Sequence, residues 1–192
     1  MRPLRHALVL TVTAGLALSM LSACGDDATP AASSPNSTAT ATTGGDAPAA
    51  GEAFDPCKKI TAAEIGAIVG FTVVMKEVPG GGCSYDPADD PRATTISIDE
   101  GETNAGGGIE SAKQGSTGTI AGEPVALSGV GDAAYIVVGK GKALGKNSFQ
   151  AQAGLEIKGQ LIMVTVIQLG NATKDQVTKF VTEATKLVAS KV

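Results

Sequence analysis

The sequence has 192 residues, with 15 basic and 19 acidic side chains that give a net charge of −4 at pH 7. This acidic balance argues against nucleic-acid binding, which needs a basic surface. The chain has no tryptophan and only one histidine, His6, so the residue type most often used as a general base is scarce.

The N-terminal segment has the pattern of a secretory signal peptide. A basic start with Arg2 and Arg5 is followed by an uncharged stretch over residues 7–21, "ALVLTVTAGLALSML". This stretch is short for a membrane-spanning helix, which needs about 20 apolar residues. We therefore predict that residues 1–23 are a signal peptide rather than the first helix of the fold.

The uncharged stretch ends in "LSAC", residues 21–24, which resembles the lipobox of bacterial lipoproteins. The resemblance implies that the Cys24 sulfur receives a diacylglycerol and that the chain is cleaved between Ala23 and Cys24. Because two acyl chains hold a protein firmly on a membrane, we expect a lipid anchor at the outer face of the cytoplasmic membrane. The alternative is a cysteine that lies near a conventional cleavage site by chance.

Residues 24–53 follow as a polar segment rich in Ala, Thr, Ser, Gly and Pro. Such a composition cannot bury enough apolar surface to fold, so we predict a disordered tether. Cleavage after Ala23 leaves 13 of the 15 basic residues, no histidine and a net charge of about −6. This charge argues against electrostatic attraction to an anionic membrane.

Residues 54–192 are long enough for a single globular domain with its own core. With Cys24 assigned to the lipid, Cys57 and Cys83 remain as a pair in an exported, oxidising setting. We predict that these two cysteines form a disulfide. The alternative is two free buried thiols.

Two capping boxes mark the clearest helices of this domain. Thr61 and Glu64 open a short helix that ends at Gly70, and Thr173 and Gln176 open a C-terminal amphipathic helix. A further short helix is expected around residues 109–113. Strands are predicted over residues 72–78, 95–99, 125–127, 133–138, 148–158 and 160–169.

The runs of strands between the two helices indicate an α+β domain with a mostly antiparallel sheet. We expect the short N-terminal helix and the C-terminal helix to pack on this sheet. The segment 160–169 is apolar at both alternating sets of positions, which is typical of a central strand covered on both faces.

Two stretches of the domain carry a family resemblance. "FDPCKKITAAEIGAIVG" at 54–70 and "GGCSYDP" at 81–87 resemble the DUF3558 family of lipoproteins from high-GC Gram-positive bacteria, with the triplet Asp55, Pro56 and Cys57 as the most specific part. "LSGVGDAAYIVV" at 127–138 is similar to a turn and strand found across such lipoproteins. The family has no known function, so the resemblance implies a location and an architecture and assigns no catalytic residue.

Few residues of the exported chain suit catalysis or metal binding. Without histidine, and with its cysteines paired, it lacks the histidine-based nucleophile systems and histidine-containing zinc sites. "DPADDP" at 86–91, with Asp86, Asp89 and Asp90, fits a solvated loop better than a weak site for a hard cation such as Ca²⁺. Arg92, the lone arginine after residue 23, is expected to be a surface charge.

The glycine- and lysine-rich stretch "GKGKALGKNS" at 139–148 lacks the spacing of a phosphate-binding P-loop. We expect a hairpin tip instead, whose Lys140, Lys142 and Lys146 could face an acidic partner. The sequence therefore predicts no catalytic, metal-binding or cofactor-binding residue and no cofactor.

These observations favour a non-enzymatic lipoprotein, anchored to the membrane and extracytoplasmic, that binds an envelope protein or a small ligand as a monomer. The alternative is a carrier that holds a lipid or glycolipid in an apolar cavity. An envelope hydrolase that uses carboxylates is a third, weaker hypothesis.

Overall fold

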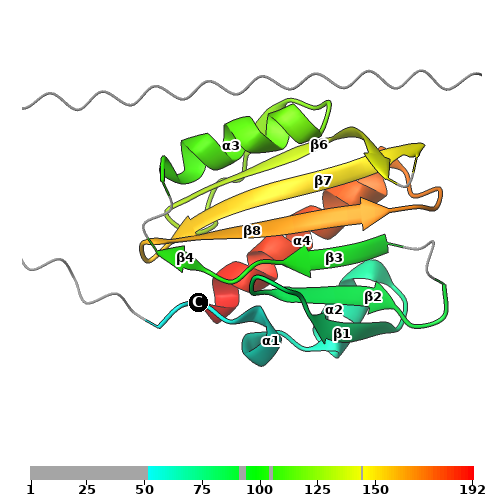
Figure 1. The fold of residues 1–192 in the computed structure, drawn as a ribbon, viewed down its shortest axis with the longest axis horizontal. Coiled ribbons are helices and arrows are strands. Elements are labelled where there is room, and N and C mark those ends of the chain that lie inside the picture. The colour runs from blue at the N-terminus through cyan, green and yellow to red at the C-terminus, as the bar shows by residue number, and fades with distance from the viewer. Residues whose placement is uncertain (1–51, 91–93, 104–105, 144) are drawn as a thin grey trace, which may run out of the picture. The chain divides into compact units, whose positions relative to one another are not determined.

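A computed structural model describes residues 52–90, 94–103, 106–143 and 145–192. The predicted signal peptide, Cys24, the tether up to residue 51 and Arg92 lie outside these ranges, so what the sequence indicates about them stays a prediction. The described residues belong to one compact unit, Gly44–Val192, drawn as a ribbon in Figure 1. None of the helices within the described ranges is long and apolar enough to cross a membrane.

The predicted α+β class is confirmed, and every strand pairing is antiparallel. The strands form one sheet in the order β1-β2-β3-β8-β7-β6-β5, with the two-residue β4 pairing with β8 beside this path. In chain order the elements are α1 (Pro56–Lys59), α2 (Ala62–Val69), β1 (Val73–Glu77), β2 (Cys83–Pro87), β3 (Thr94–Ile98), β4 (Glu102–Thr103), α3 (Gly108–Thr119), β5 (Pro124–Ala126), β6 (Ala133–Ala143), β7 (Lys146–Ile157), β8 (Gln160–Gln168) and α4 (Lys174–Lys191).

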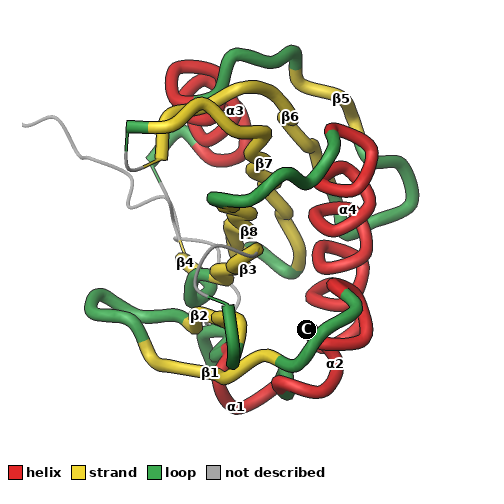
Figure 2. The backbone as a smooth tube through the Cα atoms, turned by 90° about the vertical axis from the view of Figure 1, so that its right-hand side faces the viewer, coloured by secondary structure: helices red, strands yellow, loops and turns green. Residues whose placement is uncertain are grey.

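The main core lies between one face of the sheet, here called the inner face, and helices α2 and α4 (Figure 2). Side chains alternate between the two faces along a strand, and the inner-face residues of β8, Ile162, Val164 and Val166, are fully buried. The buried face of α4 supplies Val177, Val181, Ala184 and Val188, at the spacing predicted from the sequence. The strand β8 therefore occupies the centre of the sheet and of the core.

Among the described residues, the opposite face of the sheet, here called the outer face, is covered only at one end. Helix α3 packs there on β6 and β7, where Ile120, Tyr135 and Val137 form a second small cluster. On β8 the outward side chains of Leu161 and Met163 are only half-buried, and Ile167 is 39% exposed. The predicted cover on both faces of this strand is therefore wrong for the outer face, because α3 does not extend over it.

Both predicted capping boxes are confirmed. At α2 the Glu64 amide donates to the Thr61 hydroxyl at 3.3 Å, and the Thr61 amide donates to the Glu64 carboxylate at 2.9 Å. Gly70 then ends this helix with a φ of +85°, a conformation that favours glycine. Thr173 and Gln176 make the same pair of hydrogen bonds at the start of α4.

The triplet that carries the family resemblance fixes α1 to the sheet. The Asp55 carboxylate caps α1 by accepting hydrogen bonds from the amides of Cys57 and Lys58. Cys57 forms a disulfide with Cys83, the first residue of β2, as predicted. The hydroxyl of Tyr85, two residues further on, lies 3.2 Å from the Pro56 carbonyl oxygen. These contacts give the triplet a structural role.

Two predicted boundaries on the outer face need correction. The sequence predicts a loop over "DPADDP", but in the structure Asp86 and Pro87 continue β2. The Asp86 carboxylate accepts hydrogen bonds from the hydroxyls of Ser84 and Thr95 and from the Lys76 ammonium group, at 2.9, 3.2 and 3.1 Å. Although burial opposes the shift, these bonds lower the pKa of Asp86 and hold its side chain on the sheet.

Helix α3 is also longer than the short helix expected around residues 109–113. It runs from Gly108 to Thr119 without a side-chain cap. Its sequence contains three glycines, which disfavour helix. The helix forms because Ser116, together with Ile120 at the end of the helix, packs against Tyr135 of β6. This tertiary contact cannot be predicted from the local sequence.

Candidate binding cleft

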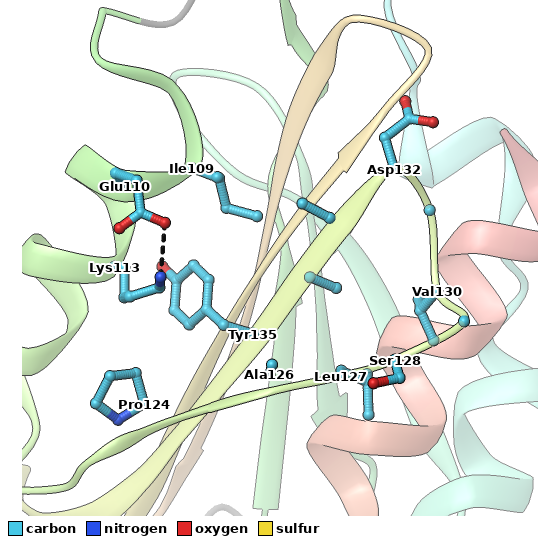
Figure 3. A pocket seen from close by; sticks show the side chains of 14 residues that line it. Ile109, Glu110, Lys113, Pro124, Ala126, Leu127, Ser128, Val130, Asp132 and Tyr135 are labelled. Carbon is cyan, nitrogen blue, oxygen red and sulfur yellow. Dashed lines mark hydrogen bonds and ion pairs between the residues drawn. The ribbon is translucent and has the colours of Figure 1, made fainter.

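A cleft of about 430 Å³ lies between α3, β5 and the turn that leads into β6 (Figure 3). One wall is the first turns of α3, with Ile109, Glu110 and Lys113. Pro124 and Ala126 of β5 and the segment 127–135 form the rest of the lining. The cleft is thus built on the outer face of the sheet, where the cover by α3 begins.

Tyr135 forms the floor of the cleft and fixes α3 to the sheet. Its side chain is 1% exposed, and its hydroxyl lies 2.9 Å from that of Ser116, which is also buried. Burial raises the pKa of Tyr135, while the hydrogen bond with Ser116 opposes the rise. The ring lies over Gly154 of β7, where an added Cβ would collide with it. The floor of the cleft is therefore preformed, and its Tyr135 hydroxyl is uncharged at neutral pH.

The turn over residues 127–132 forms a second rigid wall. Gly129 and Gly131 have φ values of +76° and +61°, and Val130 between them is buried in the main core. The Asp132 amide donates to the Glu156 carbonyl at 2.8 Å, and the Asp132 carboxylate accepts from the Lys158 amide at 2.9 Å. The hydrogen bonds of Asp132 at one end and a buried valine in the middle hold this wall in place.

The rim of the cleft carries an ion pair. Lys113 and Glu110, one turn apart on α3, lie 2.6 Å from each other, and their side chains are 31% and 71% exposed (Figure 3). Such a pair contributes little to stability because both groups remain in contact with water. Both charges are available to a ligand that enters the cleft.

Side chains commonly used in catalysis are few among the described residues near this cleft. The hydroxyl of the buried Ser116 is engaged in its hydrogen bond with Tyr135. The described residues include no histidine, and both of their cysteines are in the disulfide. Nowhere in the described ranges do three or more acidic, cysteine or histidine side chains gather as they would around a metal ion.

The residues singled out from the sequence do not meet in this cleft. Cys57 and Cys83 join α1 to β2, Asp89 and Asp90 lie exposed after β2, and Lys140 and Lys142 lie exposed near the end of β6. The stretch 127–138 was identified only as a turn and a strand, yet its first nine residues line the cleft. The sequence signal was present there, but it did not indicate that α3 lies opposite.

Comparisons with known proteins place the chain in a family context. A family model described as "Protein of unknown function (DUF3558)" matches residues 19–144. No curated protein matches the chain. The crystal structure of LpqN, involved in cell envelope biogenesis of Mycobacterium tuberculosis, is similar over 58% of this chain and 72% of its own, with 18% identity and a TM-score of 0.35.

Proposed function

This chain belongs to the DUF3558 family, and from that premise we propose that it is an extracytoplasmic lipoprotein whose domain binds a ligand or protein partner without catalysing a reaction. The proposal has two parts, an anchor at Cys24 and a recognition site in the cleft beside α3. Each part is supported by different residues and can fail separately.

The anchor is supported by the sequence around Cys24. The basic start, the uncharged stretch and "LSAC" together have the order of a lipoprotein signal. The described domain begins about 30 residues after Cys24, which leaves a tether long enough to hold it off the membrane surface. A Cys24→Ala variant, expressed in the native host, is expected to leave the membrane fraction. Retention of the variant at the level of the parent would contradict the anchor.

The proposed recognition site rests mainly on the rigid cleft beside α3. Small-ligand and peptide sites are usually preformed, apolar and furnished with a few polar groups, and a volume of about 430 Å³ is within their range. Here the walls carry aliphatic side chains together with Ser128 and Asp132, the floor is a buried tyrosine, and one ion pair lies at the rim. This geometry supports binding as the role of the cleft.

A site-directed cross-linking experiment tests this role. A photoreactive phenylalanine analogue replaces Ser128 in the cleft or, as a control, the exposed Ser190 on α4. In cells of the native host we expect one defined envelope component to be linked at Ser128 and not at Ser190. Binding of that purified component is then expected to fall in Lys113→Glu, which reverses a rim charge. Identical products from both positions would overturn the cleft as the recognition site.

The alternative of a lipid carrier finds less support in the packing. A carrier that encloses a lipid needs an interior apolar cavity. In this domain the space between sheet and α4 is filled by side chains with no exposed surface, among them Ile162, Val164 and Val181. We therefore place recognition at the surface cleft and not in the core.

A further inference from the structure

A second cleft, of about 440 Å³, lies on the inner-face side of the same sheet edge, between β5, β6 and the start of α4. Figure 2 shows β5 and the N-terminal end of α4 on the same side of the molecule. Successive residues of a strand point to opposite faces, so Val125 lines this second cleft while its neighbours Pro124 and Ala126 line the first. The two clefts are thus separate sites on either side of β5.

The floor of the second cleft is a continuous apolar strip. Val125 and Ile136 are cross-strand partners, and Val138 and Phe149 extend the strip along β6 and β7. Ile136 and Val138 are only 7% and 8% exposed, whereas Val125 is 58% exposed, the highest value among the large exposed apolar side chains. An apolar chain laid along the strip would cover Val125 and remove this surface from water.

The charges around the strip are mainly positive. Lys140 of β6 and Lys174, the first residue of α4, both line the cleft and are exposed. Neither takes part in any of the five ion pairs among the described residues. Glu123 is the one carboxylate in the lining. Two lysines that form no ion pair with another described residue, beside an apolar strip, are complementary to a molecule with an apolar chain and a negative head.

We infer that this second cleft binds a single-chain anionic amphiphile, with the alkyl chain on the strip of Val125, Ile136, Val138 and Phe149 and the head between Lys140 and Lys174. A small molecule is favoured over an acidic protein segment by the size of the site. A stable protein interface buries about 800 Å² on each partner, whereas most of this strip is already covered by its own neighbours. The inference does not depend on the proposed function of the cleft beside α3.

Decanoate is the probe that tests the inference, with decyltrimethylammonium as its cationic counterpart of equal chain length and acetate as the head without a chain. Residues 44–192 form a compact unit with its own core, so this fragment is titrated without detergent and below micelle formation. We expect decanoate to bind at least about tenfold more tightly than either control molecule. Backbone amide NMR shifts are expected at Val125, Ile136 and Val138 and not around Ser128.

Matched variants locate the head group. Lys140→Gln with Lys174→Gln is expected to weaken decanoate binding about tenfold or more. Lys142→Gln with Lys179→Gln removes two exposed charges from the same strand and helix outside the cleft, and is expected to change binding less than about twofold. Val125→Thr, on an exposed position that leaves folding intact, is expected to weaken decanoate binding while acetate is unaffected.

Three results would overturn the inference. Equal binding of decanoate and decyltrimethylammonium would show that the two lysines do not distinguish an anionic head group from a cationic one. Equal losses in the two lysine double variants would show a general charge effect. Binding of an acidic apolar peptide by a fragment that ignores decanoate would assign the cleft to a protein partner instead.

Discussion

The inner and outer faces of the sheet are made of the same strands, yet they differ in how much of their surface is covered by helices. On the inner face α2 and α4 cover the strands, and most of the side chains there are removed from water. On the outer face α3 covers only β6 and β7, and polar side chains such as Ser84, Ser97 and Thr165 lie opposite one another across three strands. The comparison indicates that stability resides mainly on the inner face, whereas the partial cover of the outer face leaves room for the cleft.

Truncation of neighbouring residues on β8 gives the largest expected contrast between the faces. Ile162→Ala, on the inner face, removes a side chain with no exposed surface and is expected to lower the free energy of unfolding by about 4 kcal/mol. Met163→Ala, the next residue but on the outer face, is expected to cost about 1 kcal/mol or less. Urea unfolding of both variants measures the difference, and equal losses would break the comparison.

Loss of the disulfide is expected to have the second largest effect. Cys83 is fully buried on the inner face and Cys57 is 26 residues away in the sequence. The loop-entropy relation gives about 3.5 kcal/mol for closing a loop of this length. Cys57→Ser with Cys83→Ser is therefore expected to lower the unfolding free energy by about that amount, measured against the parent under oxidising conditions. A parent that loses no stability on full reduction would contradict this expectation.

A substitution beneath α3 tests the packing on the outer face of the sheet. In Gly154→Ala the new methyl group meets the Tyr135 ring, and overpacking of this kind costs about 1 to 3 kcal/mol. We expect a loss of about 2 kcal/mol and faster hydrogen exchange in α3, with α4 unchanged. Gln152→Ala, two residues away on the same face, serves as the control. Exchange that rises equally in both helices would show that the two clusters are one cooperative core.

The smallest expected effect concerns an ion pair between the helices of the inner face. The Glu64 carboxylate of α2 lies 2.6 Å from the Lys191 ammonium group of α4. Its bond with Lys191, followed by bonds from Thr61, lowers the pKa of Glu64 from 4.5 to about 2. A lowered folded-state pKa means that this contribution to stability is present above pH 4.5 and is lost as the pH falls toward 2.

Carboxyl NMR titration of two variants tests this pair. In Lys191→Met the pKa of Glu64 is expected to rise, while its bonds with Thr61 keep it below 4.5. Lys186→Met, which removes a different lysine of α4 paired with Glu183, is expected to leave the pKa of Glu64 unchanged. An unchanged value in Lys191→Met would show that Thr61 alone causes the shift.

The sequence predicts the features of this fold that depend on neighbours in the chain. Thr61 with Glu64 and Thr173 with Gln176 carry their own capping partners three residues away, so both helix starts were placed correctly. The alternation of Ile96 and Ile98 with polar residues likewise matches the buried side of β3. The cysteine pairing followed from the small number of cysteines.

The features that the sequence did not predict depend on distant partners. Gly115 and Gly118 oppose helix formation locally, and only the contact with Tyr135 explains why α3 continues to Thr119. Gly139 and Lys140 are poor strand formers, yet pairing with Gln150 and Phe149 of β7 extends β6 beyond them. The cleft beside α3 is made by this helix and this hairpin together, so no single stretch of sequence could reveal it.

The position of α4 in the chain has a consequence for biosynthesis. Every strand of the sheet precedes residues 174–191 in the sequence, yet this helix covers the apolar side of β6, β7 and β8. Until these residues are synthesised, the apolar side of the strands in the nascent chain remains uncovered. Exposed apolar surface of this kind favours aggregation. Synthesis that stops before residue 174 is therefore expected to leave a chain that host chaperones and proteases recognise.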